Sequence, residues 1–464
     1  MKQKILFLNP PTGLYVREDR CQSALKDFII QFARPPHELL LMAAPCEAEG
    51  HICGVRDYPA ERRPVAGVER DIVGFAPDHI VINATVPTLR DDLRWGKKIK
   101  TILPRARVII RGGFTPQRAE DIMHMSNAPD FVFYGEDEYT LRDLIRSGVP
   151  GDVPGIVYRA DGSCRKTKPR SFIRQLDELP RVNRDLIKNE LYTRPDTCTR
   201  CALIEVGRGC PYQCVFCLAP AMHGSHPRYR SAENIVDEID ECVTRYDIRS
   251  FHFKSDCFTA DTEWVAALCR EIIRRGLSIE WFANSRVDTV NEALIRLMKE
   301  SGCFALSFGT ESGSEFILKK IGKNIHPRDS LNAISWCRVH GIKSYCYFII
   351  GFPWDTRETI KETISFACRL NPAAVDFFFP YLFEGTSLAE SVQPNGMDSK
   401  RHSYTDVQIG NNALTKKELI HLRKKALRTF YFRPRYVFGL ARTLSRRQLG
   451  GVIGMGMRML SKLL

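Results

Sequence analysis

The sequence predicts an α/β protein with two largely parallel sheets. Short apolar runs that suit buried strands alternate with amphipathic runs that suit helices, once in residues 1–150 and again in residues 201–400. Such alternation is typical of parallel sheets covered by helices. At 464 residues the chain is also too long for one ordinary domain. We therefore expect a doubly wound domain at 1–150, a connector at 151–200, a partial barrel at 201–400 and a helical tail at 401–464.

In residues 1–150 the predicted strands end in small or polar residues. The strands are expected at 4–8, 52–57, 79–83, 107–111 and 130–134, with helices at 36–49, 86–103, 116–125 and 138–146. Doubly wound sheets bind ligands beyond the carboxyl ends of their strands, and small residues there let a backbone approach a ligand closely. Ordinary turns between strands and helices would show the same glycines, so both readings stay open. The candidate ligand contacts are Asn9, Pro10, Thr85, Gly112, Gly113, Gly135 and Glu136.

Residues 151–200 are rich in proline and mixed charge, which favours a connector with a hairpin around Asp161 and Gly162. A C-x2-C pair, Cys198 and Cys201, closes this segment. No further cysteines nearby complete a metal site in the sequence. We therefore expect ordinary thiols, with an auxiliary cluster or redox pair as the alternative.

Six strand–helix units follow in residues 201–400. The strands are expected at 202–206, 250–253, 278–283, 304–308, 343–350 and 374–379, and the helices at 231–246, 261–274, 290–300, 314–320, 328–340 and 356–370. Six units are too few for a closed eight-stranded barrel, so we expect a partial barrel with one open side. Polar residues and a turn follow four successive strands, at the edge where barrels carry their active sites. They are Asp256, Arg286, Glu311 and the turn at Gly351.

The most specific motif is a C-x3-C-x2-C loop after the first strand of this barrel. Its thiols belong to Cys210, Cys214 and Cys217. Structural zinc sites usually close with four ligands. Three thiolates can instead hold three irons of a [4Fe–4S] cluster and leave the fourth iron open to a small chelating ligand. Gly209, Pro211 and Phe216 suit a tight cluster loop, so we favour this interpretation over three buried free cysteines.

Composition limits the classes of partner. The formal net charge is +14, which is typical of proteins that meet nucleic acid, anionic lipid or phosphorylated ligands. No aromatic-basic nucleic-acid motif is present, so we favour an anionic cofactor or lipid surface over DNA or RNA. Sixteen cysteines without a secretory signal favour a reducing, cytoplasmic environment. No apolar stretch is long enough to predict a transmembrane helix.

The tail combines basic and apolar residues. Residues 415–432 read as a basic amphipathic helix, and residues 437–464 mix leucine, valine, isoleucine and methionine with arginine and lysine. Such a segment can lie at the inner membrane surface with its cations toward anionic headgroups. It can equally clamp the barrel and leave a solvated basic face. The pattern does not decide between these two.

The cysteine loop, with Phe216 inside it, resembles the signature of radical S-adenosylmethionine (SAM) enzymes. The segments 251–258, 307–313 and 347–353 resemble the family's motifs on the second, fourth and fifth strands. This resemblance implies a six-unit partial barrel, a [4Fe–4S] cluster on the three cysteines, and SAM chelated to the open iron. Reduction would then cleave SAM to methionine and a 5′-deoxyadenosyl radical that removes hydrogen from an unactivated carbon.

The same resemblance suggests roles for the residues at the strand ends. Phe216 would lie beside SAM, Asp256 and Arg286 would contact its amino and carboxylate ends, and Glu311 its ribose. Gly351 would lie near the adenine. An electron donor such as a flavodoxin or ferredoxin is implied as a partner.

Residues 6–136 are similar to the cobalamin-binding domains of one subgroup, which includes the anaerobic magnesium-protoporphyrin cyclase, hopanoid-modifying enzymes and C-methyltransferases. The Asp-x-His-x-x-Gly motif that supplies a cobalt-ligating imidazole is absent, because neither Asp78-His79 nor Gly50-His51 fits it. We therefore expect cobalamin bound without that ligand, with a domain that binds none as the alternative.

The function expected from these patterns is methylation, cyclisation or rearrangement of a bulky, hydrophobic small molecule. One alternative is an RNA or protein modifier resembling methylthiotransferases, which carry three further cysteines in their N-terminal domain. Cys21, Cys46 and Cys53 match that pattern only loosely. A second alternative is a cobalamin or iron–sulfur sensor that catalyses nothing. A sensor would not need the series of polar residues at the strand ends.

Overall fold

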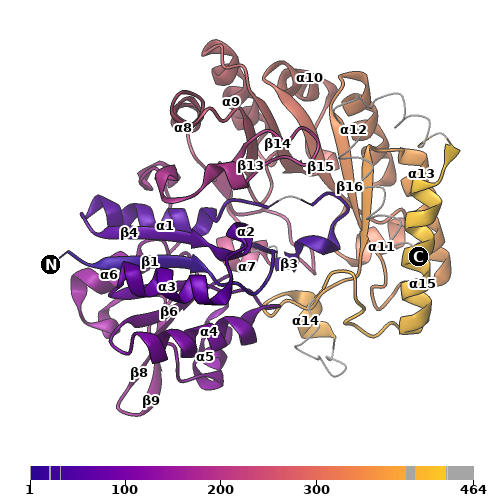
Figure 1. Cartoon of the computed structure of the whole chain (residues 1–464). Helices are drawn as coiled ribbons and strands as arrows, with labels where there is room; N and C mark the ends of the chain where they lie inside the picture. Colours follow the sequence, from indigo (N-terminus) through magenta and orange to yellow (C-terminus); the bar gives the residue numbers. More distant parts are fainter. Residues whose placement is uncertain (1, 20–21, 32, 393–402, 435, 437–464) are drawn as a thin grey trace. The chain divides into compact units, whose positions relative to one another are not determined.

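A computed structural model describes residues 2–19, 22–31, 33–392, 403–434 and 436 (Figure 1). The chain forms two compact units. Unit 1 is built from the described parts of Met1–Leu25, Ala33–Tyr192 and Ala221–Gly224, and unit 2 contains the rest of the described chain.

Unit 1 contains a seven-stranded sheet of order β4-β1-β5-β6-β7-β8-β9. The first five strands in this order pair in parallel, which confirms the doubly wound sheet. The order reverses between β1 and β5, so the sheet has a switch point there. Its strands are β1 (Lys4–Asn9), β4 (Ile52–Asp57), β5 (His79–Asn83), β6 (Arg107–Arg111), β7 (Phe131–Phe133), β8 (Ile156–Ala160) and β9 (Ser163–Lys166).

Helices cover both faces of this sheet and form two separate cores. On one face Leu6, Ile80 and Val108 meet apolar side chains of α3, α4 and α5, and on the other Phe7 and Val81 meet those of α1 and α6. Strands buried on both faces explain the continuous apolar runs in the sequence. The helices are α1 (His37–Ala48), α2 (Tyr58–Glu61), α3 (Val65–Phe75), α4 (Leu89–Ile102), α5 (Pro116–Met125) and α6 (Thr140–Ser147).

Three features of unit 1 were not expected from the sequence. Strands β8 and β9 form an antiparallel hairpin at the sheet edge, so part of the expected connector belongs to the first sheet. The predicted hairpin at Asp161 and Gly162 is confirmed, and both residues have the positive φ that a tight two-residue turn needs. A second hairpin, β2 (Tyr15–Arg17) with β3 (Gln22–Ala24), and helix α3 were missed.

Unit 2 contains six parallel strands in sequential order, β10-β13-β14-β15-β16-β17. This arrangement confirms the open partial barrel. The strands are β10 (Cys201–Glu205), β13 (Ser250–Lys254), β14 (Glu280–Ser285), β15 (Cys303–Glu311), β16 (Lys343–Ile349) and β17 (Ala374–Phe378). Strand β15 runs three residues further than expected, so Glu311 ends the strand itself instead of lying in a loop beyond it.

The barrel helices begin where the sequence offers side-chain caps. The side chains of Ser231, Asp261 and Asn291 accept backbone N–H groups in the first turns of α8, α9 and α10. The helices are α7 (Ala219–His223), α8 (Ala232–Tyr246), α9 (Thr262–Arg274), α10 (Glu292–Glu300), α11 (Glu315–Lys320), α12 (Pro327–Val339), α13 (Arg357–Leu370), α14 (Ser387–Ser391) and α15 (Lys416–Tyr431).

Helix α15 clamps the barrel, which decides between the two readings of residues 416–431. It packs against α13 and the edge strand β17. The Arg423 guanidinium donates to the Phe377 carbonyl at 2.6 Å, and the Tyr431 hydroxyl accepts from the Val375 N–H at 2.9 Å. Both contacts satisfy backbone groups of β17, the edge strand of the sheet as far as the described residues show it. The rest of the basic tail, residues 437–464, lies outside the described residues.

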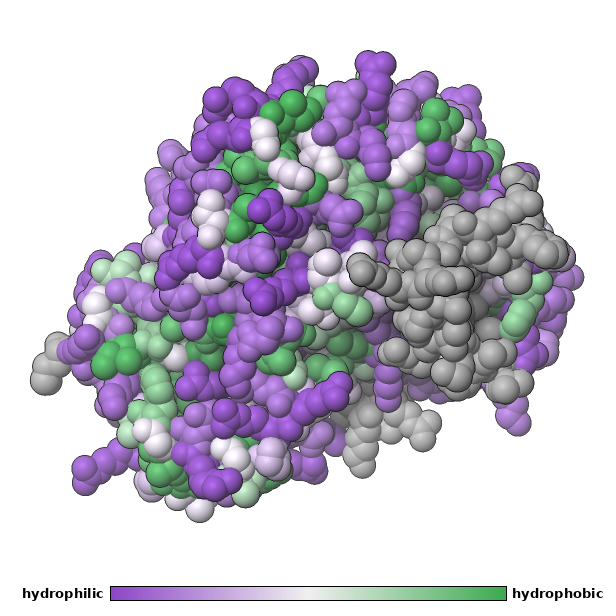
Figure 2. Space-filling view, turned by 45° about the horizontal axis from the view of Figure 1, so that its top comes forward, coloured by the Kyte–Doolittle hydropathy of each residue, from purple (hydrophilic) through white to green (hydrophobic). Residues whose placement is uncertain are grey.

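The described helices include none that is long and apolar enough to cross a membrane. On the face shown in Figure 2, hydrophobic residues are scattered among hydrophilic ones. Large exposed apolar side chains such as Leu14, Val73 and Phe316 come from different elements. Single exposed apolar residues of this kind are ordinary on protein surfaces.

Candidate functional site

The three cysteines lie in a loop that follows β10 and the two-residue strand β11 (Gly207–Arg208), which pairs with β12 (Arg228–Tyr229). All three are free thiols. Cys210 is buried, and Cys214 and Cys217 are half-buried. The Cys217 N–H donates to the Cys214 carbonyl at 3.0 Å, which closes a tight turn between them. The loop therefore holds three thiols close together in the chain at the carboxyl end of the first barrel strand.

Two neighbouring segments hold this loop in place. At its start the Gly209 N–H donates to Asp256 Oδ2 at 2.8 Å, and Gly209 has a φ of +85° that glycine adopts without strain. In its middle the Val215 N–H donates to the Ile321 carbonyl at 3.0 Å, at the end of α11. Asp256, predicted to contact SAM, thus also fixes the loop that carries the cysteines.

The aromatic residue of the loop meets the turn after β16. The rings of Phe216 and Phe352 lie 5.9 Å apart, and Phe352 follows Gly351, which has a φ of +89°. The N–H groups of Gly351 and Phe352 both donate to Asp355 Oδ2, at 2.8 and 3.0 Å. Burial raises the pKa of Asp355 to about 6, although these hydrogen bonds favour its ionised form. Asp355 thereby fixes the turn beside Phe216.

Arg286, directly after β14, faces a cysteine of the loop. Its Nη1 lies 3.9 Å from Cys214 Sγ, and its guanidinium carbon lies 3.6 Å from the centre of the Tyr212 ring. Nε and Nη2 donate to the two oxygens of Asp288, each at 2.9 Å, and Nη2 also donates to the Lys323 carbonyl. Four of the five N–H groups of a guanidinium are thus used, and one on Nη1 remains for a ligand.

Glu311, at the end of β15, is paired with a lysine that the sequence analysis did not single out. Lys323 Nζ lies 2.9 Å from Glu311 Oε1, and the two side chains are only 8% and 7% exposed. Burial alone would lower the pKa of Lys323, but Glu311 and the nearby Cys214 raise it. Glu311 has a φ of +61°, uncommon for a residue with a side chain. This backbone conformation, with the lysine, fixes where the carboxylate lies.

These contacts connect the predicted positions of the barrel through one loop. Asp256 and Arg286 contact the cysteine loop directly. The Gly351 turn contacts it through the next residue, Phe352, whose ring lies near that of Phe216. Glu311 joins them through Lys323, whose carbonyl accepts from Arg286. The sequence did not predict the roles of four further residues, because these roles come from contacts made in the fold: Tyr212, Asp288, Lys323 and Asp355. For Asp355 one signal was present, an acid four residues after a strand-end glycine.

Two cations lie near the thiols of the loop. No group of three or more His, Cys, Asp and Glu side chains in the described chain converges where one ion would bind. A cubane binds one thiolate on each of three irons, so its ligands need not converge on one point. Burial raises the pKa of Cys214, but Lys323 and Arg286 favour its thiolate. Two cations beside the loop thus offset the negative charge that thiolates bring.

A fourth cysteine touches the loop. Cys257, in the segment after β13, is 3% exposed and contacts Cys210. The neighbouring Cys257 thiol raises the pKa of Cys210, and the Cys210 thiol lowers that of Cys257. The second C-x2-C pair differs from this arrangement: Cys198 is exposed, whereas Cys201 is buried at the start of β10.

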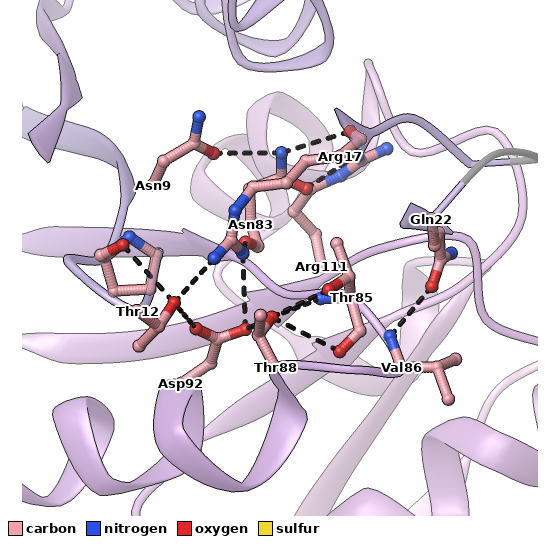
Figure 3. Close-up of polar contacts among 11 residues, drawn as sticks. Asn9, Thr12, Arg17, Gln22, Asn83, Thr85, Val86, Thr88, Asp92 and Arg111 are labelled. Carbon is pink, nitrogen blue, oxygen red and sulfur yellow. Dashed lines mark hydrogen bonds and ion pairs between the residues drawn. The ribbon is translucent and has the colours of Figure 1, made fainter. Parts of the chain in front are cut away.

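In unit 1 two of the predicted ligand contacts, Asn9 and Thr85, lie at the switch point between β1 and β5 (Figure 3). Asn9 and Asn83 end these strands, and Asn83 Nδ2 donates to Asn9 Oδ1 at 3.1 Å. Arg17 of the β2–β3 hairpin reaches the same place, donates to the Asn83 carbonyl and forms a buried ion pair with Asp92 at 3.3 Å. The hairpin therefore occupies part of the edge where ligands of doubly wound sheets bind.

Other predicted contacts at this edge are engaged by the chain itself. Thr85 Oγ1 lies 2.7 Å from Thr88 Oγ1, and Glu136 Oε2 accepts from the Ile173 N–H at 2.7 Å. Pro10 is buried, and its carbonyl accepts from the Thr12 N–H. These residues line the edge, but their contacts with a cofactor stay a prediction.

Packing within unit 1 explains the two adjacent glycines, Gly112 and Gly113. A Cβ on Gly112 would lie 2.5 Å from the Ala84 carbonyl oxygen, and one on Gly113 would lie 2.1 Å from the Asp19 carbonyl oxygen. The approach of Ala84 thus requires glycine at 112, and packing of the hairpin requires it at 113, so glycine itself is no sign of a ligand at these positions. Gly135 differs, because it has a φ of +76° and open space within 4 Å of a Cβ.

The two histidines considered as cobalt ligands lie at the opposite edge of the sheet. His79 begins β5, and His51 immediately precedes β4 and accepts from the Gln3 N–H at 3.2 Å. A strand of five residues separates His79 from the carboxyl edge at Asn83. One buried histidine that the sequence analysis did not consider, His37, begins α1, the helix that follows β1 and the hairpin.

The chain is similar to known proteins over both of its units. The family model described as the radical SAM superfamily matches residues 204–367. An uncharacterised methyltransferase of Pyrococcus horikoshii is 31% identical over 440 residues, which cover 93% of each chain. The anaerobic magnesium-protoporphyrin IX monomethyl ester cyclase of Rubrivivax gelatinosus is 24% identical over 384 residues, 80% of this chain and 68% of the cyclase.

A solved structure shares the whole fold. It is the radical S-adenosylmethionine methyltransferase TsrM of Kitasatospora setae with cobalamin and a [4Fe–4S] cluster bound. The TM-score is 0.72 at 16% identity, and the match covers 100% of this chain and 99% of TsrM. At this identity the match establishes the shared fold, which includes the sheets of both units.

Proposed function

The chain belongs to the radical SAM superfamily of enzymes, and on that premise we propose that it methylates an unactivated carbon of an apolar small molecule. The cofactors proposed are a [4Fe–4S] cluster, SAM and cobalamin. The observation that carries the proposal is the three-thiol loop, held at the end of β10 against Asp256, Arg286 and the Gly351 turn.

The cluster is assigned to Cys210, Cys214 and Cys217. When bound together with SAM, it supplies reductive cleavage of the carbon–sulfur bond, which yields methionine and a 5′-deoxyadenosyl radical. The chain's own part is to hold and orient these groups. Asp256 fixes the start of the loop through Gly209, and Arg286 and Lys323 place positive charge beside Cys214.

The barrel residues are assigned to the parts of SAM. Asp256 is assigned to the SAM amino group, because a carboxylate accepts hydrogen bonds and Asp256 is joined to the start of the cysteine loop through the Gly209 N–H. The remaining N–H of Arg286 is assigned to the SAM carboxylate. Glu311, fixed by Lys323, is assigned to the ribose hydroxyls. Phe216 and Gly351 are assigned to the adenine side, because their segments meet through Phe352.

Cobalamin is assigned to the carboxyl edge of the first sheet. The fold shared with TsrM, whose structure holds cobalamin, supports this assignment. The proposed contacts are those predicted from the sequence: Asn9, Pro10, Thr85, Gly112, Gly113, Gly135 and Glu136. Neither His51 nor His79 is assigned to cobalt, because both lie at the amino edge.

Methylation is proposed ahead of cyclisation because a methyltransferase is similar over 93% of this chain. An apolar substrate is proposed because the porphyrin-ester cyclase is also a relative. A flavodoxin- or ferredoxin-like electron donor is proposed as partner, and the net charge of +14 suits an acidic carrier. Contact of the tail with a membrane surface stays a proposal about residues 437–464.

The test compares wild-type protein with Cys214→Ala and with Cys368→Ala, a half-buried cysteine on α13. Each is purified without oxygen, reconstituted with iron and sulfide, reduced with dithionite and supplied with SAM. Wild type and Cys368→Ala are expected to hold a [4Fe–4S] cluster and to release 5′-deoxyadenosine, and Cys214→Ala to do neither. Release of 5′-deoxyadenosine by Cys214→Ala would contradict the assignment.

A separate measurement tests cobalamin. After incubation with hydroxocobalamin and gel filtration, the corrinoid absorbance is expected to remain with the protein in all three variants. A protein that elutes free of corrinoid would contradict the cobalamin assignment and leave the cluster assignment intact.

A further inference from the structure

The guanidinium of Arg286 is held by an aspartate two residues further along the chain. Its Nε and Nη2 donate to Oδ1 and Oδ2 of Asp288, each at 2.9 Å. Two parallel hydrogen bonds between planar groups fix the plane of the guanidinium as well as its position. Solvent reaches this ion pair only in part, because the side chains of Arg286 and Asp288 are 7% and 26% exposed. The contact with Asp288 therefore sets the orientation of the guanidinium.

Two further contacts restrict the same guanidinium. Its central carbon lies 3.6 Å from the centre of the Tyr212 ring, so the ring supports the group. Nη2 also donates to the Lys323 carbonyl at 2.8 Å. The remaining nitrogen, Nη1, lies 3.9 Å from Cys214 Sγ. The unused N–H of Arg286 is thus on the nitrogen that lies beside the cysteine loop.

The backbone that carries Asp288 is itself well anchored. Asp288 belongs to the short 3-10 turn Val287–Thr289, and Val287 is buried in the core of the barrel. The Thr289 hydroxyl donates to the Arg286 carbonyl at 3.1 Å, and its oxygen lies 2.6 Å from that of Thr259. Because the turn is held from both sides, Asp288 can act as a fixed support for the arginine.

This support matters because an arginine side chain has several rotatable bonds. A ligand that binds an unrestrained arginine must order the side chain, and the lost freedom lowers the affinity. In Arg286 the ordering is already done by the fold. A carboxylate that reaches Nη1 therefore meets a donor whose direction is set before binding.

We propose that Asp288 is a positioning residue for SAM, which holds Arg286 so that the remaining N–H of Nη1 meets the SAM carboxylate. The inference rests on the proposed function, in which Arg286 binds that carboxylate. Asp288 itself does not touch SAM. Its negative charge offsets part of the positive charge of Arg286 and by itself would weaken the attraction. Positioning and charge thus predict opposite effects of removing Asp288.

The experiment measures SAM binding by isothermal titration calorimetry on the full chain, reconstituted without oxygen and left unreduced so that SAM is not cleaved. Asp288→Ala is expected to bind SAM about tenfold more weakly, because Arg286 must then be ordered by the ligand. Asp288→Asn keeps one acceptor oxygen and is expected to lose less. The control is Asp237→Ala, which removes an aspartate of α8 that pairs with Arg275 at 2.7 Å. It is expected to bind SAM as wild type does.

A second ligand separates positioning from general damage to the site. 5′-Methylthioadenosine shares the adenosine of SAM but lacks its carboxylate, and it is expected to bind wild type and both Asp288 variants equally. An equal loss of affinity for both ligands in Asp288→Ala would overturn the inference.

Two other results would also overturn it. One is SAM binding by Asp288→Ala that is unchanged or tighter, and the other is loss of the cluster from both Asp288 variants. A wild-type protein that takes up no cluster, or that holds a cluster and binds no SAM, would instead refute the proposed function. The two failures are therefore distinguishable.

Discussion

Replacing Lys323 with methionine is expected to destabilise unit 2 strongly, because it leaves a buried carboxylate without its partner. The two charged atoms of Lys323 and Glu311 lie 2.9 Å apart, and both side chains are less than 10% exposed. Removing one member of such a buried pair costs about 3–5 kcal/mol of unfolding free energy, because the other charge stays desolvated. Removing both charges, in Glu311→Gln with Lys323→Met, is expected to cost clearly less than the sum of the single changes.

Urea unfolding of the cluster-free protein measures this coupling. Four of the five tryptophans, among them buried Trp281 on β14, lie in unit 2, so the tryptophan fluorescence reports mainly on this unit. The double-mutant cycle is expected to give a coupling energy of about 1–3 kcal/mol between the two residues. Lys319→Met, an exposed lysine on α11, serves as the control and is expected to change stability by less than about 0.5 kcal/mol. Additive single effects, with a coupling near zero, would refute this reasoning.

Three further predictions concern stability. Burial lowers the pKa of His79 from 6.5 to about 4, so this histidine is expected to contribute a loss of about 3 kcal/mol of stability as the pH falls from 6.5 to 4, because the unfolded chain binds the proton first. In urea unfolding at several pH values, His79→Gln should lack this loss. Gly113→Ala places a Cβ 2.1 Å from the Asp19 carbonyl oxygen and is expected to cost about 1–3 kcal/mol, whereas Gly74→Ala, with open space in α3, should stabilise by up to about 1 kcal/mol. Asp355→Ala leaves two backbone N–H groups without their acceptor and is expected to cost about 1.5–3 kcal/mol, and Asp355→Asn, which keeps one acceptor oxygen, less.

Each of these predictions has a clear contrary result. An equal pH dependence in wild type and His79→Gln would show that this histidine is not buried in its neutral form. Equal melting temperatures for Gly113→Ala and Gly74→Ala would contradict the packing of the hairpin on the sheet edge. Asp355→Asn as unstable as Asp355→Ala would mean that the acceptor oxygen is not what fixes the turn.

Patterns within one segment were predictable from the sequence. The buried strands of both sheets appear as continuous apolar runs, and the cysteine spacing placed three thiols in one loop after β10. The positions of Asp256, Arg286 and Gly351 followed from strand ends, because parallel strands bring their carboxyl ends to one edge. Helix α15 was predicted within one residue at each end.

Features that depend on contacts between distant segments were not predictable. Lys323 pairs with Glu311 only because α11 returns to the end of β15, and Cys257 meets Cys210 only through strand pairing. Helix α3 was missed because Gly67 and Gly74 lower its helix propensity, although Val68 and Ile72 bury its apolar face. The strands of the β2–β3 hairpin have only three residues each, too few to show an alternating pattern. Arg17 of this hairpin occupies the carboxyl edge of the first sheet, where the sequence had predicted ligand contacts at glycines.

The central claim is that the three-cysteine loop holds a cluster with one iron open to SAM. Electron paramagnetic resonance of the dithionite-reduced, reconstituted protein tests it most directly, with spectra recorded before and after SAM is added without oxygen. The account predicts a [4Fe–4S] signal that changes shape on addition of SAM, because SAM binds the open iron directly. A cluster signal that is identical with and without SAM would contradict the account.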